Sequence, residues 1–215
     1  MLPAGVEGFL AHNSKMNLSP ISDGEMVHMS GIMDFNISYN GYPSVKTEYE
    51  ISISIPEEYP KQPPIFKEIS DRIPKKPEYH INWDDSLCLG SPLRLTISLK
   101  ECSDFEVYCH NNLYPYIYAV TLKITQGVDW VFGELAHGTK GEIEDYAEIF
   151  GMEGEGKVLD CLAAVYKKKR IANKHPCPCG CSLRLGKCPL HLRINRFRYQ
   201  VGRIYAGTAW RKLKS

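Results

Sequence analysis

Hydrophobic and polar residues alternate along two stretches of the chain, residues 27–37 and residues 45–55. In both stretches the apolar side chains, except Ile32, occupy odd positions, and the residues between them are mostly polar. A period of two is typical of a β-strand with one buried face. The pair Asn40-Gly41 between the stretches is a strong turn signal, and Pro56 ends the second stretch because proline cannot donate to a sheet. The pattern therefore predicts a β-hairpin.

The chain around this hairpin reads as a mixture of helices and one further strand. We expect a short helix over residues 6–12 and a third strand over residues 65–69. An irregular stretch follows through about residue 110, and its length favours a functional role. The order of helix, antiparallel strands, long loop and later helices predicts an α+β fold, an antiparallel sheet with flanking helices.

Helical spacing returns after the irregular stretch. Apolar residues recur every three or four positions over residues 113–131, with Asn111 or Asn112 as the expected N-terminal cap and Gly127 as a break. Two further helices are expected over residues 141–150 and 157–172. We therefore divide the chain into a domain of residues 1–152, a linker helix of residues 153–173, and a small cysteine-rich module with a basic tail, residues 174–215.

Charge is divided unevenly between the two ends of the chain. Residues 161–215 hold 14 of the 26 Lys and Arg residues and none of the 25 Asp and Glu residues. The other residues therefore carry 12 basic and 25 acidic side chains, a balance of −13. Such asymmetry indicates either a basic segment that docks on an acidic partner or a solvated basic helix and tail.

The sequence predicts a protein of the cytoplasm without a membrane span. The first residues have neither a basic start nor a long apolar run, and no stretch approaches the roughly 20 apolar residues that cross a bilayer. In such a compartment the eight cysteines favour metal binding or catalysis over disulfides.

Four of these cysteines gather near the C-terminus in CPCGCSLRLGKCPLH, residues 177–191. The spacing Cys177-x-Cys179-x8-Cys188 resembles the zinc knuckle at the C-terminus of the SecA motor protein. Zinc takes four tetrahedral ligands, and a tight Cys-x-Cys turn supplies two of them. We expect zinc bound by Cys177, Cys179, Cys188 and His191, with Cys181 as the alternative fourth ligand.

A second resemblance covers about residues 20–150. After the predicted hairpin come a proline-rich segment, a His-x-Asn motif and a Leu-Cys-Leu motif, formed by Pro56, Tyr59, Pro60, Pro63, Pro64, His80, Asn82, Leu87, Cys88 and Leu89. This order is similar to that of the ubiquitin-conjugating enzymes, the Ubc family. The chain departs from the eukaryotic pattern in three ways: His80 and Cys88 are eight positions apart, Ile81 replaces a proline, and residues 90–109 do not match. These departures suggest a bacterial branch.

The resemblance implies a transferase in which Cys88 carries an activated acyl group as a thioester. The thiolate is the attacking form of a cysteine, and Cys88 follows a polar turn that would expose it. Asn82 is expected either to stabilise the oxyanion of the reaction or to order the loop. His80 is expected to hold the loop backbone. Cys102 and Cys109 are candidate second thiols, for which a structural role is the simpler interpretation. Residues 132–138, with Glu134 and His137, either line the thiol cleft or connect two helices.

A chain that combines a Ubc-like domain with a SecA-type zinc knuckle resembles the stand-alone conjugating proteins of bacterial anti-phage operons, the CBASS systems. They imply that the acyl donor is the C-terminus of a cGAS-like nucleotidyltransferase. The sequence has no Gly-rich phosphate loop, so we expect another protein to activate the carboxylate. Two other functions stay open: a non-catalytic binding module, and a nucleic-acid contact through Arg196, Phe197, Arg198, Tyr199 and Arg203. We expect neither a membrane nor a nucleic acid as partner.

Overall fold

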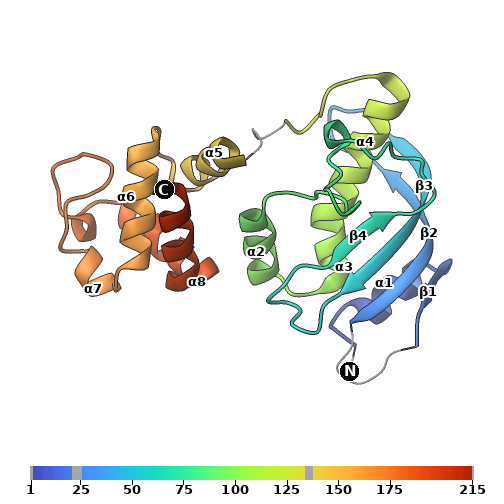
Figure 1. Cartoon of the computed structure of the whole chain (residues 1–215), viewed down its shortest axis with the longest axis horizontal. Coiled ribbons are helices and arrows are strands. Elements are labelled where there is room, and N and C mark those ends of the chain that lie inside the picture. Colours follow the sequence, from blue (N-terminus) through green and yellow to red (C-terminus); the bar gives the residue numbers. More distant parts are fainter. Residues whose placement is uncertain (1, 21–25, 134–137, 215) are drawn as a thin grey trace. The chain divides into compact units, whose positions relative to one another are not determined.

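The computed structural model describes residues 2–20, 26–133 and 138–214, so Glu134 and His137 lie outside the described residues. The chain divides into two compact units, Met1–Gly133 and Glu134–Ser215 (Figure 1). The helix α5, Gly138–Phe150, belongs to the second unit, whereas the sequence had placed it in a domain of residues 1–152. The reason is aromatic packing, because Phe150 meets Phe197 of the last helix at a ring separation of 4.9 Å.

A four-stranded antiparallel sheet forms the framework of the first unit. Its strands follow the chain in the order β1 (Met16–Leu18), β2 (Val27–Ile37), β3 (Val45–Ile55) and β4 (Ile65–Glu68). The predicted hairpin is confirmed, since β2 pairs with β3 along its whole length. The predicted third strand is β4, while β1 is a strand that the sequence pattern did not predict.

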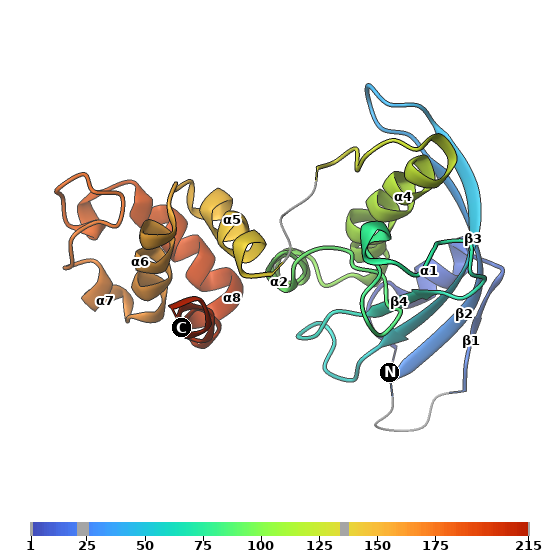
Figure 2. The same cartoon turned by 45° about the horizontal axis from the view of Figure 1, so that its top comes forward.

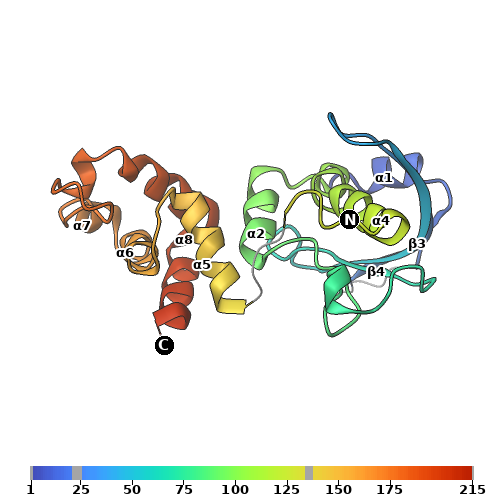
Figure 3. The same cartoon turned by 90° about the horizontal axis from the view of Figure 1, so that it is seen from above.

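Helices cover one face of this curved sheet. The odd-numbered residues of β2 and β3 face the core, and Met33, Phe35, Ile51 and Ile53 are at most 1% exposed. The helix α4, Tyr114–Gln126, lies across this face, as Figure 2 shows. The helix α1, Val6–His12, lies on the same side of the sheet (Figure 3). The alternation read from the sequence therefore separates a helix-covered face from a polar face.

The helix expected from residue 111 begins earlier. It runs from α3, Phe105–Tyr108, through a π-helical segment η2, Cys109–Leu113, into α4. Asp104 caps it by accepting a hydrogen bond from the Val107 amide, so the expectation of Asn111 or Asn112 as the cap is wrong. The Asn112 amide instead donates to Ser98 Oγ at 3.1 Å. The helix stops at Gly127, as predicted, with a positive φ of 66°.

The irregular stretch of the sequence contains two more ordered elements. The 3-10 turn η1 spans Pro77–Tyr79, and the helix α2 spans Pro92–Glu101. Ser91 caps α2 by accepting a hydrogen bond from the Arg94 amide at 3.1 Å. These elements bracket residues 80–91, which contain the motif with Cys88.

The second unit is helical. It contains α5, α6 (Glu155–Tyr166), α7 (Lys169–Ala172), the 3-10 turn η3 (Leu185–Lys187) and α8 (Leu190–Lys214). The helix expected over residues 157–172 is broken between α6 and α7, where Lys167 is extended. The basic tail of the sequence is the helix α8, which packs beside α6 and kinks at Gly202 (Figure 1). No helix in the described ranges has both the length and the apolar character needed to cross a membrane.

Candidate active site and metal centre

Cys88 lies at the end of a short β-hairpin formed by residues 80–88. The Cys88 amide donates to the His80 carbonyl at 2.7 Å, which closes the base of this hairpin. One residue earlier, the Leu87 amide donates to the Phe66 carbonyl of β4 at 2.8 Å, and the Leu87 side chain is only 5% exposed. Cys88 itself is half-buried. The backbone that leads into Cys88 is therefore held to the sheet and to the opposite hairpin strand.

The pairing of this hairpin places Asn82 and Cys88 on the same face. Ile81 and Leu87 form an antiparallel bridge, so the pairs on either side of it point to the opposite face. One of those pairs is Asn82 with Ser86, and the Asn82 Nδ2 donates to Ser86 Oγ at 3.0 Å. The other pair is His80 with Cys88, so Asn82 and Cys88 are diagonal neighbours on this face. Such neighbours in an antiparallel pair are about 7–8 Å apart. An amide has two N–H donors, so Asn82 keeps one beyond its bond to Ser86.

The aromatic residue Tyr116 holds the segment that leads into the hairpin. The Tyr116 hydroxyl on α4 donates to the Tyr79 carbonyl at 2.9 Å. Burial raises the pKa of Tyr116, and the negative charge of a Cys88 thiolate nearby raises it further. Tyr116 therefore stays neutral and adds no charge that would oppose a thiolate. Sequence reasoning missed this contact because α4 and Cys88 are distant along the chain.

His80 is packed at the base of the hairpin. Its ring packs edge to face against the Trp130 ring, with the two ring centroids 4.3 Å apart. The Trp130 Nε1 donates to the Glu78 carbonyl at 3.2 Å. The His80 backbone has a positive φ of 53° and its carbonyl accepts from Cys88. These contacts favour the positioning role that the sequence suggested for His80.

The other two thiols of the first unit have different surroundings. Cys109 is 1% exposed, and burial raises its pKa well above the ordinary value. A thiol that is both inaccessible and protonated is a poor nucleophile. Cys102 is half-buried and follows the last turn of α2. Of these three thiols, Cys88 alone lies on the hairpin that carries Asn82.

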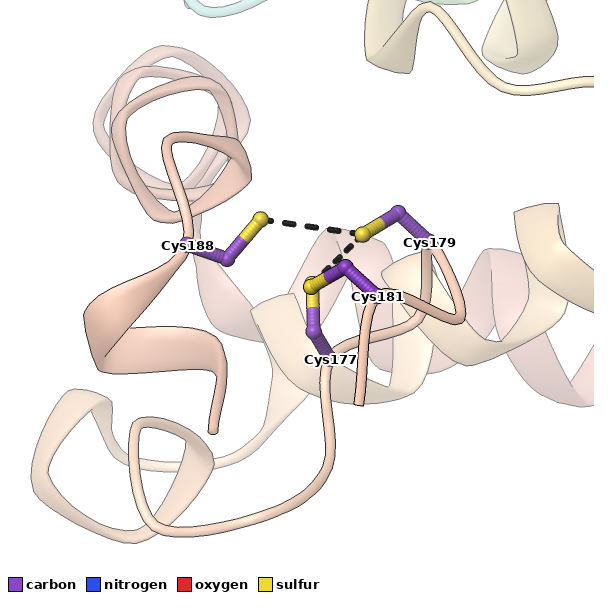
Figure 4. Close-up of side chains that lie close together, drawn as sticks. All are labelled: Cys177, Cys179, Cys181 and Cys188. Carbon is purple, nitrogen blue, oxygen red and sulfur yellow. Dashed lines mark hydrogen bonds between the residues drawn. The ribbon is translucent and has the colours of Figure 1, made fainter. Parts of the chain in front are cut away.

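Four of the five cysteines of the second unit form a cluster that could hold a metal ion. Their sulfur atoms, from Cys177, Cys179, Cys181 and Cys188, all lie within 4.8 Å of one another (Figure 4). The Sγ of Cys179 is 3.2 Å from that of Cys177 and 3.6 Å from that of Cys188. Four sulfurs bound tetrahedrally at about 2.3 Å from a metal would be about 3.8 Å apart. The cluster therefore needs only small shifts to match such a coordination sphere.

A tight turn brings the first three cysteines of this cluster together. The Cys177 amide donates to the Leu183 carbonyl at 2.9 Å, and the Leu185 amide donates to the His175 carbonyl at 2.9 Å. Gly180, with a φ of 83°, turns the chain between them, in a region that favours glycine. Cys188 reaches the cluster from η3 and the start of α8. A metal bound here would join a loop to the start of a helix.

The fourth member of the cluster is Cys181, whereas the sequence had favoured His191. The His191 Nδ1 lies 2.7 Å from the Cys188 carbonyl oxygen, and His191 is not among the grouped ligand atoms. Hydrogen bonding, first by the Cys177 thiol, lowers the pKa of Cys179 to about 7. Burial raises the pKa of Cys177. Cys179 is therefore the first of these two thiols to become a thiolate, the form that binds metal.

The residues suggested for nucleic-acid contact mostly have structural roles. Phe197 is 1% exposed and belongs to the aromatic packing of the second unit. The Arg198 Nη2 donates to the Ala164 carbonyl at 2.7 Å, and the Arg203 Nε donates to the Tyr166 carbonyl at 2.7 Å. Both guanidinium groups thus satisfy carbonyls at the C-terminal end of α6. Part of the positive charge of the basic segment is therefore used in hydrogen bonds to the C-terminal end of α6.

Comparisons of the chain with protein-family models, with curated proteins and with solved structures give no match. Support for a function therefore comes from two candidate sites in the structure. One is a half-buried thiol on a hydrogen-bonded hairpin of the α+β unit, and the other is a cluster of four cysteines that could bind a metal ion.

Proposed function

We propose that Cys88 is the acyl-carrying nucleophile of a ubiquitin-conjugating-like transferase. It accepts the C-terminal carboxyl group of a protein as a thioester and passes it to an amine. The observation that carries this proposal is the hairpin of residues 80–88, which fixes a half-buried thiol and presents the Asn82 amide on the same face. A carrier cysteine needs both access and a nearby donor for the oxyanion of its reaction.

The reaction consists of two acyl transfers. The Cys88 thiolate first forms a bond to the carbonyl carbon of an activated donor, and the leaving group of that donor departs with its electron pair. An amine nitrogen then attacks the thioester carbon, the carbon–sulfur bond breaks, and the amine gives its proton to water or to a base. Attack of the amine on the thioester produces a tetrahedral oxyanion, which the second N–H of Asn82 can stabilise. Another protein must supply the activated donor.

The chain resembles the conjugating proteins of bacterial CBASS anti-phage systems, and we extend the proposal to that role. The acyl donor would then be a cGAS-like nucleotidyltransferase, and the reaction would take place in the cytoplasm. The support is the order of the sequence motifs together with a four-stranded antiparallel sheet before the cysteine hairpin.

Zinc is the metal we propose for the four-cysteine cluster. A tetrahedral set of four thiolates is typical of structural zinc, and the close sulfur atoms fit such a sphere. The residues that would hold it are Cys177, Cys179, Cys181 and Cys188. With four protein ligands the ion has no open position, so its contribution is to hold the loop against α8 and not to take part in acyl transfer.

The proposed function can be tested on the native protein. Material isolated from cells without reducing agents should carry a covalent adduct that thiols release. Mass spectrometry of the digested adduct should find the C-terminal residues of a second protein attached to the peptide that contains Cys88. An adduct located on Cys102, or one that thiols fail to release, would contradict the proposal.

Asn82→Ala should slow transfer from Cys88 to an amine by about 10²–10³-fold, and should slow loading of Cys88 much less. The amide stabilises the oxyanion of aminolysis, which forms only after the thioester exists. The measurement is single-turnover kinetics of each step.

The matched control for this prediction is Ser86→Ala. This substitution removes the hydrogen bond between Ser86 Oγ and the Asn82 amide but leaves the amide in place. Transfer should therefore stay within a few-fold of the unaltered protein. If Asn82→Ala slowed loading and transfer equally, its role would be to order the hairpin.

A further inference from the structure

Trp83 is the most exposed of the large hydrophobic side chains that the structure describes, with 97% of its surface accessible. It lies at the tip of the hairpin, directly after Asn82, and five residues before Cys88. Tryptophan is highly buried on average because its indole removes a large apolar area from water. Among the residues that the structure describes, none covers this side chain, and it lies on the same hairpin as the proposed nucleophile.

The turn that carries Trp83 is held by hydrogen bonds on both sides. The Asp84 carboxylate accepts from the Ser86 amide at 3.1 Å and from Ser86 Oγ at 2.6 Å. The Asp85 amide donates to the Asn82 carbonyl at 3.0 Å, and the Lys67 Nζ donates to the Asp84 carbonyl at 2.7 Å. A turn fixed in this way loses little conformational entropy when its exposed side chain is covered. Trp83 is thus presented as a preorganised aromatic contact.

The two ends of the hairpin differ in what surrounds them. At the base, His80 packs against Trp130 at 4.3 Å, and Tyr116 bonds to the carbonyl of Tyr79. At the tip, Asn82 and Trp83 are exposed. An extended chain that brings its terminal carboxyl group to Cys88 can therefore approach from the exposed tip of the hairpin, past Trp83.

We propose that Trp83 is a specificity-determining residue for the acyl donor, and that its indole packs against a nonpolar side chain in the C-terminal tail of that donor. This inference rests on the proposed function. His80 lies opposite Cys88, so Trp83 is three residues along the hairpin from the thiol. Three residues of strand span about 10 Å, and an extended tail advances by the same rise. The nonpolar side chain is therefore three residues before the C-terminal residue of the donor.

Synthetic peptide thioesters provide the test. In transthioesterification the Cys88 sulfur forms a bond to the acyl carbon, and the small thiol of the peptide thioester leaves, taking up one proton for the one that Cys88 loses. Two peptides are compared that differ only three residues before the C-terminus, where one has leucine and the other glycine. The second-order rate of loading onto the full-length protein is followed by intact mass.

The leucine peptide should load about five- to tenfold faster than the glycine peptide, a difference typical of one well-packed aromatic contact. Trp83→Ala should reduce the leucine rate to the glycine rate and leave the glycine rate unchanged. Trp83→Phe should keep most of the preference. Tyr199→Ala removes another exposed aromatic ring, 75% accessible on α8, and should change neither rate.

The outcomes separate this inference from the proposed function. Loading of both peptides without a leucine preference, or an equal loss of both rates in Trp83→Ala, overturns the role of Trp83 alone. A leucine preference that is greatest at another position of the peptide overturns the extended path along the hairpin. Failure of every peptide thioester to load Cys88 in the unaltered protein overturns the proposed function, and the inference with it.

Discussion

Cys88→Ser should abolish the thiol-sensitive adduct completely. The thiolate of a cysteine is a strong nucleophile, whereas a serine hydroxyl stays protonated near neutral pH. The hydroxyl is therefore a far weaker nucleophile, and an oxyester formed by it would transfer poorly to amines. The measurement is gel electrophoresis, with and without reductant, of each variant produced together with the proteins encoded beside it. A faint band that resists thiols but yields to hydroxylamine would be the serine oxyester.

Cys102→Ser is the matched control for this substitution. Cys102 is half-buried, as Cys88 is, but it follows α2 and is not part of the hairpin. The adduct should form normally on this variant. Cys109 is unsuitable as a control because it belongs to the buried core, where a hydroxyl group would disturb packing. An adduct that survives Cys88→Ser and disappears with Cys102→Ser would move the active site to Cys102.

Cys181→Ser should lose the bound metal, and His191→Ala should retain it. The sulfur of Cys181 belongs to the group of four, whereas the His191 Nδ1 is directed to the Cys188 carbonyl. Loss even of an outer partner of a metal ligand lowers affinity by about 10–100-fold, so loss of a direct ligand should lower it further. Elemental analysis of the purified variants should find one zinc per chain in His191→Ala and almost none in Cys181→Ser. The opposite pattern would restore the histidine as the fourth ligand.

Removal of the metal should affect the two units differently. The apolar core of the first unit, from Val6 to Leu122, is formed by its own residues, so a chelator should leave its amide exchange unchanged. Residues 174–191 should exchange faster, because the turn around the cysteines is too small to have a core of its own, whereas the rest of α8 packs against α5 and α6. Hydrogen exchange measured with and without the chelator distinguishes this result from a general loss of stability.

The sequence predicted the elements whose pattern is local and regular. Alternation over residues 27–37 and 45–55 was sufficient to place β2 and β3, and Gly127 marked the end of α4. The helix α2 was missed because Leu93, Leu95, Ile97 and Leu99 alternate with polar residues, as in a strand. Its readable signal was the cap, Ser91 followed by Pro92 at the first helical position. Only Leu93 and Leu99 of that series are buried.

The parts of the site that sequence could not supply depend on contacts between distant residues. Tyr116 and Trp130 reach the segment before Cys88 from α4 and from the chain after it, and no spacing rule relates them to the thiol. Cys181, and not His191, is the fourth member of the cluster because of where the chain turns. Positive φ angles at Gly180 and Ser182 fold the loop back, and this brings the third cysteine beside the first two.

The π-helical segment Cys109–Leu113 makes the position of Tyr116 depend on a single residue. A π turn holds one residue more than an α turn and corresponds to one inserted amino acid. If the same residues formed a regular α-helix instead, α4 would be rotated by about 100° relative to α3, because an α-helix has 3.6 residues per turn. Tyr116 would then turn away from the Tyr79 carbonyl, so the π turn, which accommodates the extra residue, is what lets the helix meet the cysteine hairpin.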